Sequence, residues 1–475
     1  MSEALRRFPF LNPNTLFLMR NIQKWSLAVA LAGFLFGFDT VVISGAVDPI
    51  KTLWKITEWQ QGLLVSIALW GTVIGSIFGG KPTDSWGRKP TLIWIGILFT
   101  VSAVGSMLAW DPISFSVFRF IGGVGVGVSS VAAPAYISEI SNASSRGRLV
   151  ALYQFNIVFG ILIAFFSNFL LKGVMGDWDW RLMLGVEAIP AILYTGLVVF
   201  VPESPRWLAT KKGDTKAAQK VLESVHSSKM EAKLALKAIL KDLSSFASTK
   251  RTPGLFSKRV VMLDANNGYT ASRIFGRPLM LAFLLAMFNQ LSGINFILYY
   301  APTILENAGF AGSDSLLSSV SLGGVNLLFT FVGLYFIDRL GRRQLMYIGS
   351  VGYIFSLIMV AYAFYTEAAS MFTLTFILMF IASHAMGQGA VIWVFISEIF
   401  PNTVRGAGQS WGTGTHWVFA ALITLLGPVV MGAFPEWTIF VFFAACMVLQ
   451  LAFTHWIMPE TKGKSLEELQ HELQR

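Results

Sequence analysis

The sequence predicts an all-α integral membrane protein with twelve transmembrane helices in two pseudo-symmetric six-helix bundles. Three observations lead to this prediction. Of the 475 residues, 54% are hydrophobic and 13% are charged, whereas soluble proteins have about 45–50% apolar and about 25% charged residues. Apolar stretches of about 20 residues, long enough to cross a bilayer, recur along the whole chain. Several short motifs of the first half also return in the second half.

The candidate spans form two groups of six, separated by one long polar segment. The first group is 26–47, 62–82, 91–109, 115–138, 149–171 and 182–201, and the second group is 278–304, 316–337, 345–365, 372–397, 408–431 and 437–458. This divides the chain into an N-terminal segment, an N-terminal bundle, a linker, a C-terminal bundle and a tail, at 1–25, 26–201, 202–277, 278–458 and 459–475. In the linker, 214–244 alternates Lys and Glu with Ala and Leu at helical spacing, which predicts surface helices on the cytoplasmic face.

Basic residues in the short loops predict the orientation. One side carries Arg88, Lys89, Arg146, Arg148, Arg339, Arg342, Arg343 and Arg405. The other side has fewer basic residues, and acidic residues dilute them. The richer side is expected to face the cytoplasm of a cell (inner) membrane, and an even number of spans then places both termini there. The same loops account for the net charge of +10, and nucleic acid is not expected as a partner because no basic stripe with interleaved aromatic residues is present.

Three motif pairs repeat at nearly one offset. The segment 84–90 (DSWGRKP) returns as 338–344 (DRLGRRQ), and 136–148 (YISEISNASSRGR) returns as 395–407 (FISEIFPNTVRGA). The third pair begins PESPRWL at 202 and PETKGK at 459, and all three offsets lie between 254 and 259 residues. The protein is therefore a duplicated six-span unit, and its site is expected between the halves, near the membrane midplane.

The seventh predicted span is unusually polar. Its segment 287–303, MFNQLSGINFILYYAPT, carries side-chain amides at Asn289, Gln290 and Asn295 and a phenol at Tyr299. Unpaired amides are costly in a membrane and persist where they pair with other helices or line a wet cavity. Uncharged donors and acceptors beside aromatic rings suit a neutral polyol, so we expect a sugar site. Tyr300, the next residue, is either a gate or plain helix packing.

Three ionisable residues lie deep in other spans: Asp39 in the first, Arg119 in the fourth and Glu187 in the sixth. Such groups are functional candidates because they are expensive to bury. An aspartate beside an arginine stays charged, and it takes up a proton when it is shielded from the arginine or dried. The alternative is a buried triad that only holds the helices together.

The three motif pairs, in this order, resemble the sugar porter family of the major facilitator superfamily, from about residue 26 to residue 469. The resemblance implies two six-helix bundles, alternating access by rocking of one bundle against the other, and interbundle salt bridges that latch the outward-facing state. We expect Asp84 to pair with Arg88, Glu139 with Arg146 and Arg148, Asp338 with Arg342, and Glu398 with Arg405. The full expected gating set is Asp84, Arg88, Glu139, Arg146, Arg148, Glu203, Arg206, Asp338, Arg342, Glu398, Arg405 and Glu460.

The resemblance also implies that the C-terminal bundle holds most of the sugar. The matching positions are Gln154, Gln290, Asn295, Asn326 and Trp393, and Asn289, Tyr299, His416 and Trp417 complete the expected substrate-binding set. A tryptophan face packs against a pyranose while amides take its hydroxyls. In this family a second Gln usually stands at Asn289 and an Asn or Gln at His416, so the sequence leaves the sugar itself open. A Pro often stands at Gln388, so the local bend of that helix is also left open.

The resemblance implies a coupling group in the proton-linked bacterial members of the family, and Asp39, Arg119 and Glu187 match it. The facilitative members resemble this pattern less, because they lack the acids that match Asp39 and Glu187. We expect Asp39 to carry the proton, Arg119 to set its proton affinity and Glu187 to compete for Arg119. The leading hypothesis is a monomeric importer of a hexose or pentose by proton symport. A uniporter without ion coupling ranks second, and a transporter-like sugar sensor ranks third. An enzyme is not expected, since no nucleophile set or metal cluster is present, and no cofactor beyond the coupling proton is expected.

Overall fold

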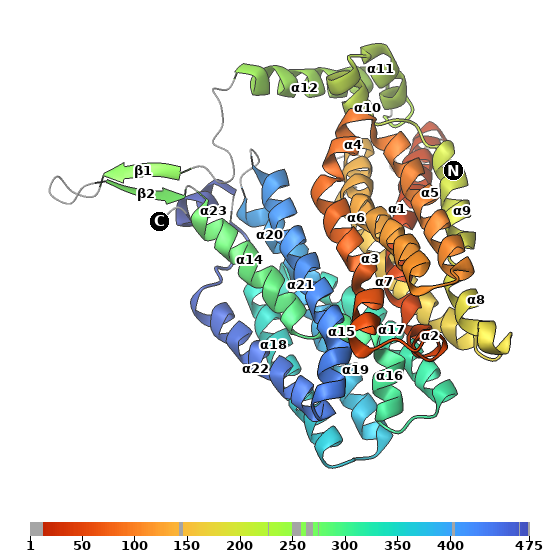
Figure 1. Ribbon diagram of the computed structural model, residues 1–475. Helices are drawn as coiled ribbons and strands as arrows, with labels where there is room; N and C mark the ends of the chain where they lie inside the picture. Colours follow the sequence, from red (N-terminus) through yellow and green to blue (C-terminus); the bar gives the residue numbers. More distant parts are fainter. Residues whose placement is uncertain are drawn as a thin grey trace, which may run out of the picture.

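The computed structural model is described over residues 13–141, 146–226, 228–248, 258–262, 269–273, 275–400, 404–464 and 466–473. Within this part of the chain, 12 helical segments are long and apolar enough to cross a membrane, in agreement with the prediction. Figure 1 shows them as two groups, helices up to α9 on one side and helices from α14 onward on the other. We call these groups the N-terminal half and the C-terminal half.

The N-terminal half contains six spans, two of which are interrupted near an end. Its elements are α1 (Pro13–Val42), η3 (Ile43–Gly45), α2 (Val47–Trp54), α3 (Glu58–Phe78), α4 (Gly80–Ser85), α5 (Arg88–Leu108), α6 (Pro112–Ile140), α7 (Arg146–Leu171), η4 (Gly176–Trp178), α8 (Asp179–Gly185) and α9 (Ala188–Val199).

The C-terminal half also contains six spans. Its elements are α14 (Gly276–Leu291), α15 (Ile294–Tyr299), α16 (Ala301–Asn307), α17 (Gly312–Leu340), α18 (Arg342–Tyr365), α19 (Ser370–Met386), α20 (Gln388–Ile399), α21 (Arg405–Ala433), α22 (Glu436–Trp456) and the short α23 (Leu466–Leu473). The seventh span breaks at Gly293, which has a φ of +86°, and the tenth breaks at Gly387. The break at Gly293 lies between Gln290 and Asn295 of the predicted sugar site.

The linker forms α10 (Pro205–Trp207), the π-helical turn η5 (Leu208–Lys212), α11 (Thr215–Glu223) and α12 (Lys229–Ser248). The predicted surface helices are thus present, and α12 lies across one end of the molecule in Figure 1. We call the end that carries α10–α12 the linker end. The strands β1 (Lys258–Met262) and β2 (Tyr269–Arg273) form an antiparallel hairpin that the sequence analysis missed. The pair Asn267-Gly268 between the strands is a hairpin signal.

The two halves share one core. A large cluster of buried apolar side chains contains residues of both halves, among them Phe36 and Trp417. Their rings lie 5.5 Å apart between centroids. Across the same interface, α3 packs on α21 and α7 packs on α17. The interface therefore runs between the first and second groups of helices, where the repeated architecture predicts the site.

Candidate functional site

The amides of the seventh span form one hydrogen-bonded cluster. Gln290 donates from Nε2 to Asn289 Oδ1 over 2.8 Å and accepts at Oε1 from Asn295 Nδ2 over 2.8 Å. Its Nε2 also lies 3.1 Å from His416 Nε2 on α21. All four side chains are buried. We call Asn289, Gln290, Asn295 and His416 the amide cluster, and it presents both donors and acceptors to a hydroxylated ligand.

Aromatic rings adjoin the amide cluster. The ring of His416 lies 5.0 Å from that of Trp393 on α20 and 4.7 Å from that of Trp417, between centroids. The buried Trp417 indole N–H has no hydrogen-bond partner among the described residues, although an indole N–H usually finds one when buried. The structure therefore brings six of the nine predicted substrate-binding residues into one neighbourhood.

The remaining three predicted substrate-binding residues lie apart from this network. Gln154 on α7 is half-buried and Asn326 on α17 is buried, and neither side chain makes a hydrogen bond within the described part of the structure. Tyr299 is fully buried and interacts electrostatically with Arg119 and Asp39. It thus connects α15, which carries Asn295 of the amide cluster, with the charged residues of the N-terminal half. The adjacent Tyr300 donates to the Thr424 carbonyl over 2.9 Å, a packing contact.

The three intramembrane charges come together inside the N-terminal half. Arg119 Nη1 donates to Asp39 Oδ1 over 2.5 Å, and Nη2 donates to the Asp39 carbonyl over 2.9 Å. Glu187 precedes α9 and interacts electrostatically with both residues. Each of the three is only 1% exposed. A carboxylate and a guanidinium so deeply buried persist only as a well-bonded pair.

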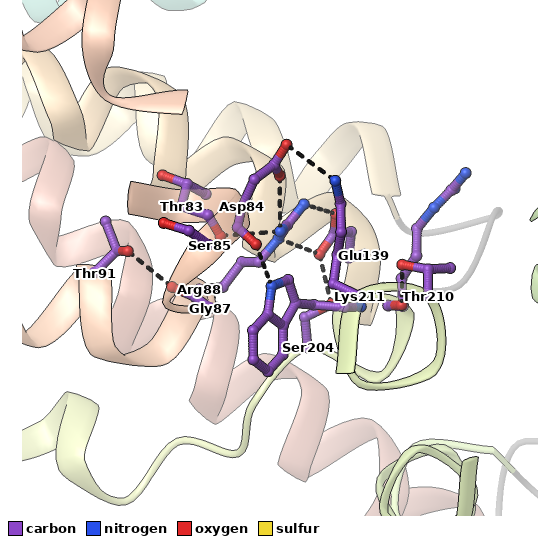
Figure 2. A network of polar contacts seen from close by, with 12 residues as sticks. Thr83, Asp84, Ser85, Gly87, Arg88, Thr91, Glu139, Ser204, Thr210 and Lys211 are labelled. Atoms are coloured by element: carbon purple, nitrogen blue, oxygen red, sulfur yellow. Dashed lines mark hydrogen bonds and ion pairs between the residues drawn. The ribbon is translucent and has the colours of Figure 1, made fainter. Parts of the chain in front are cut away.

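At the linker end, each half holds one arginine between two carboxylates. In the N-terminal half, Arg88 bonds Glu139 through Nε and Nη2 over 3.0 and 2.9 Å and Asp84 over 3.0 Å. The linker closes over this network: Ser204 donates to Glu139 over 2.5 Å and the Trp207 indole donates to the Asp84 carbonyl over 2.7 Å. Figure 2 shows these contacts, together with the Lys211–Asp84 ion pair of 3.7 Å.

The C-terminal half repeats the arrangement. Arg342 pairs with Glu398 over 2.7 Å and with Asp338 over 3.2 Å. Thr461 donates to Glu398 over 2.6 Å, in the place that Ser204 has in the other half. The sequence analysis missed Ser204 and Thr461, although both follow the glutamate of the repeated Pro-Glu motif.

Two expected pairings differ in the structure. Glu139 pairs with Arg88 rather than with Arg148, which is exposed, while the side chain of Arg146 lies outside the described residues. Glu398 pairs with Arg342, and Arg405 donates instead to the Phe400 carbonyl over 3.3 Å. Spacing along the sequence could not find these pairs, because each joins two different helices. Arg88 begins α5 and bonds Glu139 of α6, and Arg342 begins α18 and bonds Glu398 of α20. The ion pairs of Arg88 and of Arg342 each lie within one half, the Lys211–Asp84 pair joins the linker to the N-terminal half, and Arg206 lies exposed in α10.

The glutamates of the repeated Pro-Glu motif bind backbone N–H groups. Glu203 accepts from Arg88, Lys89 and Ser204, and burial raises the pKa of its carboxyl above the usual value, because these bonds offset burial only in part. For Glu460, burial also acts to raise the pKa, but four N–H groups outweigh it and leave the pKa below its usual value. The four donors are the backbone N–H groups of Arg342, Arg343, Thr461 and Lys462. Glu460 therefore keeps its charge to lower pH than Glu203.

A contact between the halves lies at the end opposite the linker. Thr303 of α16 donates from Oγ1 to Asp48 Oδ2 of α2 over 2.8 Å. Close by, a Cβ on Gly62 of α3 would come within 2.0 Å of the Leu425 carbonyl of α21, so the two helices touch backbone to backbone. The sequence analysis did not predict the Thr303–Asp48 contact, because nothing in the sequence shows which residues of two distant short helices meet.

Comparisons with known proteins agree with this architecture. A family model described as "Sugar (and other) transporter" matches residues 25–473. The D-xylose-proton symporter of Escherichia coli (strain K12) is 32% identical, with 96% of this chain and 96% of that protein covered. The arabinose-proton symporter of Bacillus subtilis (strain 168) is 33% identical, with 94% and 93% covered.

Solved structures of the xylose transporter XylE from E. coli match the whole fold. Its partially occluded inward open conformation gives a TM-score of 0.81 at 29% identity and covers 94% of this chain and 100% of that one. XylE bound to 6-bromo-6-deoxy-D-glucose gives a TM-score of 0.75 at 30% identity, with 96% and 99% covered. The duplicated twelve-span architecture, the repeated charge motifs and these matches lead to one conclusion: the chain belongs to the sugar porter family of the major facilitator superfamily.

Proposed function

We propose that this protein imports a monosaccharide, a hexose or a pentose, together with a proton by alternating access. The observation that carries the proposal is the fully buried Arg119–Asp39 pair with Glu187 beside it. A group that binds and releases a proton inside the membrane is what coupling requires, and intramembrane carboxylates serve this purpose in pumps and transporters. The xylose- and arabinose-proton symporters among the relatives support the same assignment.

The amide cluster, with the rings of Trp393 and Trp417, is the proposed sugar site. Its members bond one another in the structure, so an incoming sugar exchanges amide–amide hydrogen bonds for amide–hydroxyl bonds. Such an exchange costs little because no buried polar group is left unpaired. Gln154 and Asn326 complete the site from α7 and α17 when the halves move, and no cofactor other than the proton takes part.

Tyr299 is the proposed link between the proton and sugar sites. It lies on α15 with Asn295 and interacts electrostatically with Arg119 and Asp39 of the other half. Protonation of Asp39 weakens its bond to Arg119, because a neutral carboxyl attracts a guanidinium far less than a carboxylate does. Once it is freed from Asp39, Arg119 turns toward Glu187. The packing of Tyr299 against Arg119 and Asp39 then changes as well. The alternative, a uniporter in which the three charges only hold helices together, predicts no such coupling.

We further propose that the linker end faces the cytoplasm of the inner membrane and that both termini lie there. The basic loops of this end support this orientation. The protein is proposed to work as a monomer in the bilayer, with the linker joining two rigid bundles, and the linker-end networks of Arg88 and Arg342 bias the equilibrium between the two access states.

The test is uptake of labelled xylose, glucose, galactose and inositol into proteoliposomes, with and without an inward proton gradient. Accumulation above equilibrium that collapses with a protonophore establishes symport and identifies the sugar. Uptake that equilibrates and ignores the gradient leaves a uniporter and reduces the three buried charges to a structural role.

A further inference from the structure

His384, near the end of α19, has one ring nitrogen bonded and the other free. The Tyr353 hydroxyl of α18 lies 2.5 Å from His384 Nδ1. His384 Nε2 makes no hydrogen bond with any residue that the structure describes. In a neutral imidazole one nitrogen donates a hydrogen bond and the other accepts one. A ring that is held at Nδ1 therefore still offers one polar group to a ligand.

The exposed part of His384 opens into the protein rather than toward lipid. The three exposed side chains of α19 are Met371, Thr375 and Met379, which lie four residues apart and mark its outer side. His384 follows Thr375 by nine residues, about two and a half turns, so it lies on the opposite side of the helix. Phe380, one turn before His384 on this inner side, is fully buried. His384 is only half-buried, so a space within the C-terminal half adjoins its ring.

This space borders the side of α20 that carries Trp393. A Cβ on Gly389, the second residue of α20, would lie 3.5 Å from His384 Nε2, so the free nitrogen faces the start of that helix. Trp393 follows Gly389 by four residues and therefore shares its face. The Trp393 ring in turn lies 5.0 Å from that of His416 in the amide cluster, between centroids. The free nitrogen thus borders the proposed sugar site.

Two further contacts connect His384 and Tyr353 with the amide cluster. His384 interacts electrostatically with His416. The Tyr353 hydroxyl interacts with Ser292 of the seventh span, and the Ser292 hydroxyl donates to the Asn289 carbonyl over 2.6 Å. The Tyr353–His384 pair therefore adjoins the amide cluster from α18 and α19, two helices that hold none of the predicted substrate-binding residues.

We propose that His384 is a further sugar-binding residue, whose Nε2 donates a hydrogen bond to one hydroxyl of the sugar, and that Tyr353 is its positioning residue. The Tyr353 hydroxyl donates to Nδ1 and thereby keeps the ring proton on Nε2. The inference rests on the proposed sugar transport but not on its coupling to protons. The structural alternative is that the Tyr353–His384 bond only ties α18 to α19.

His384→Phe should weaken the recognition of one hydroxyl group. Phenylalanine keeps a planar ring and removes both nitrogens. The dissociation constant of the sugar should rise about 3- to 10-fold, as expected for the loss of one net hydrogen bond. An analogue that lacks the contacted hydroxyl should bind equally well to wild type and to His384→Phe, because it makes no bond to Nε2 in either protein.

The experiment measures equilibrium binding to the purified full-length protein by competition with a labelled sugar. Xylose, glucose, galactose and inositol are tested first, followed by each monodeoxy derivative of the sugar that binds. Tyr353→Phe should weaken binding of the parent sugar by less than His384→Phe does and should spare the same derivative. The double variant should bind no more weakly than His384→Phe alone, since Tyr353 acts through His384.

Two amide variants separate sugar binding from the bond to Tyr353. The amide nitrogen of glutamine reaches the position of Nε2, whereas the amide nitrogen of asparagine reaches the position of Nδ1. His384→Gln should therefore keep the dissociation constant within about threefold of wild type, and His384→Asn should lose as much affinity as His384→Phe. The structural alternative predicts that asparagine preserves the thermal midpoint and that neither variant changes the affinity.

Tyr347→Phe and His455→Phe are the matched controls. The Tyr347 hydroxyl lies 2.9 Å from His455 Nδ1, in a second tyrosine–histidine pair between α18 and α22, and both variants should leave every dissociation constant unchanged. Unchanged affinity in His384→Phe, or an equal loss for the sugar and all its monodeoxy derivatives, overturns the inference. If His384→Phe cannot be purified, the glutamine and asparagine variants decide alone. A wild-type protein that binds none of the four sugars overturns the proposed function instead, so the two failures are distinguishable.

Discussion

Thr303 donates a hydrogen bond to Asp48 over 2.8 Å and thereby joins the C-terminal half to the N-terminal half. Both side chains are half-buried, at the end opposite the linker helices. At the linker end, the described ion pairs of Arg88 and Arg342 stay within their own halves. The Thr303–Asp48 hydrogen bond therefore joins the halves at the end opposite the linker, which we call the closed end.

Thr303→Val should weaken this closed end. Valine keeps the shape of threonine but cannot donate, so the substitution removes about 1 kcal/mol of net hydrogen-bond energy from one conformation only. The ratio of the two access states should shift about fivefold toward opening at that end. Spin labels placed across the Thr303–Asp48 contact would report the shift as a larger population of long distances.

Thr366→Val is the control for this substitution. Thr366 is an exposed threonine at the same end, and its hydroxyl bonds the Tyr362 carbonyl of its own helix over 2.8 Å. Its replacement should leave the distance distribution unchanged. A Thr303→Val protein with the wild-type distribution would show that Asp48 contributes nothing to closure.

Asp39→Asn should abolish accumulation while it leaves exchange. Asparagine cannot take up a proton, and its neutral amide mimics the protonated carrier, so the sugar-bearing conformations still interconvert. Gradient-driven accumulation should fall at least about tenfold, whereas counterflow of labelled against unlabelled sugar should stay within about threefold of wild type. Asp111→Asn is the matched control, because asparagine also caps a helix N-terminus, as Asp111 does for α6.

An Asp39→Asn protein that still concentrates sugar would remove the proposed proton carrier. Loss of both accumulation and counterflow, with a normal elution profile in detergent, would instead support the structural alternative. In that case the Arg119–Asp39 pair would serve only to hold α1 and α6 together.

The sequence predicted the helices better than it predicted the contacts. The spans follow from local hydropathy, and the two-half architecture follows from the repeated motifs, since both signals lie along the chain. The pairing of Glu139 with Arg88 does not, because it depends on how α5 and α6 cross. The hairpin of β1 and β2 was missed because the long linker is dominated by the Lys/Glu pattern of its helices.

In the candidate site, too, the sequence predicted the residues but not the contacts between them. Asn289, Gln290 and Asn295 could be named because amides are rare in an apolar span. Their hydrogen bonds to one another and to His416 depend on the break at Gly293 and on the packing of α14 against α21. The Asp48–Thr303 contact had no sequence signal, since threonine and aspartate are ordinary at a loop or a helix surface.

Gln290→Ala should weaken sugar binding more than any other single substitution in the amide cluster. Gln290 is the residue through which Asn289, Asn295 and His416 are connected, so its loss leaves buried polar partners unpaired as well as removing its own bonds to sugar. The dissociation constant should rise about 10- to 100-fold, equivalent to about 1.4–2.8 kcal/mol. Titration of the tryptophan fluorescence with sugar measures it.

The pH dependence of uptake should be unchanged in Gln290→Ala once sugar is saturating, because the proton site lies in the other half. A dissociation constant within twofold of wild type would place the sugar elsewhere. Gln450→Leu is the control, since it removes a buried amide of the C-terminal half that lies on α22, outside the amide cluster.

Gly87→Ala should destabilise the protein, and the reason is specific to its backbone. Gly87 has a φ of +109°, and an added Cβ would lie 2.3 Å from Glu203 Oε2. Alanine in this nearly glycine-only region of φ and ψ costs about 1–3 kcal/mol, and displacement of Glu203 also disturbs the backbone N–H groups of Arg88 and Lys89. The unfolding midpoint in detergent should fall. Gly406→Ala, in a helix with nothing within 4 Å of the new Cβ, should leave it unchanged or raise it slightly.

Gln450→Leu should raise the stability of the protein. The Gln450 side chain is fully buried, and neither its Oε1 nor its Nε2 has a hydrogen-bond partner among the described residues. An unpaired buried amide costs about 1–3 kcal/mol, whereas an apolar side chain of similar volume gains free energy from the same burial. The thermal midpoint should therefore rise while uptake stays at the wild-type level. A lower midpoint would contradict the prediction and would mean that the Gln450 amide contributes to stability.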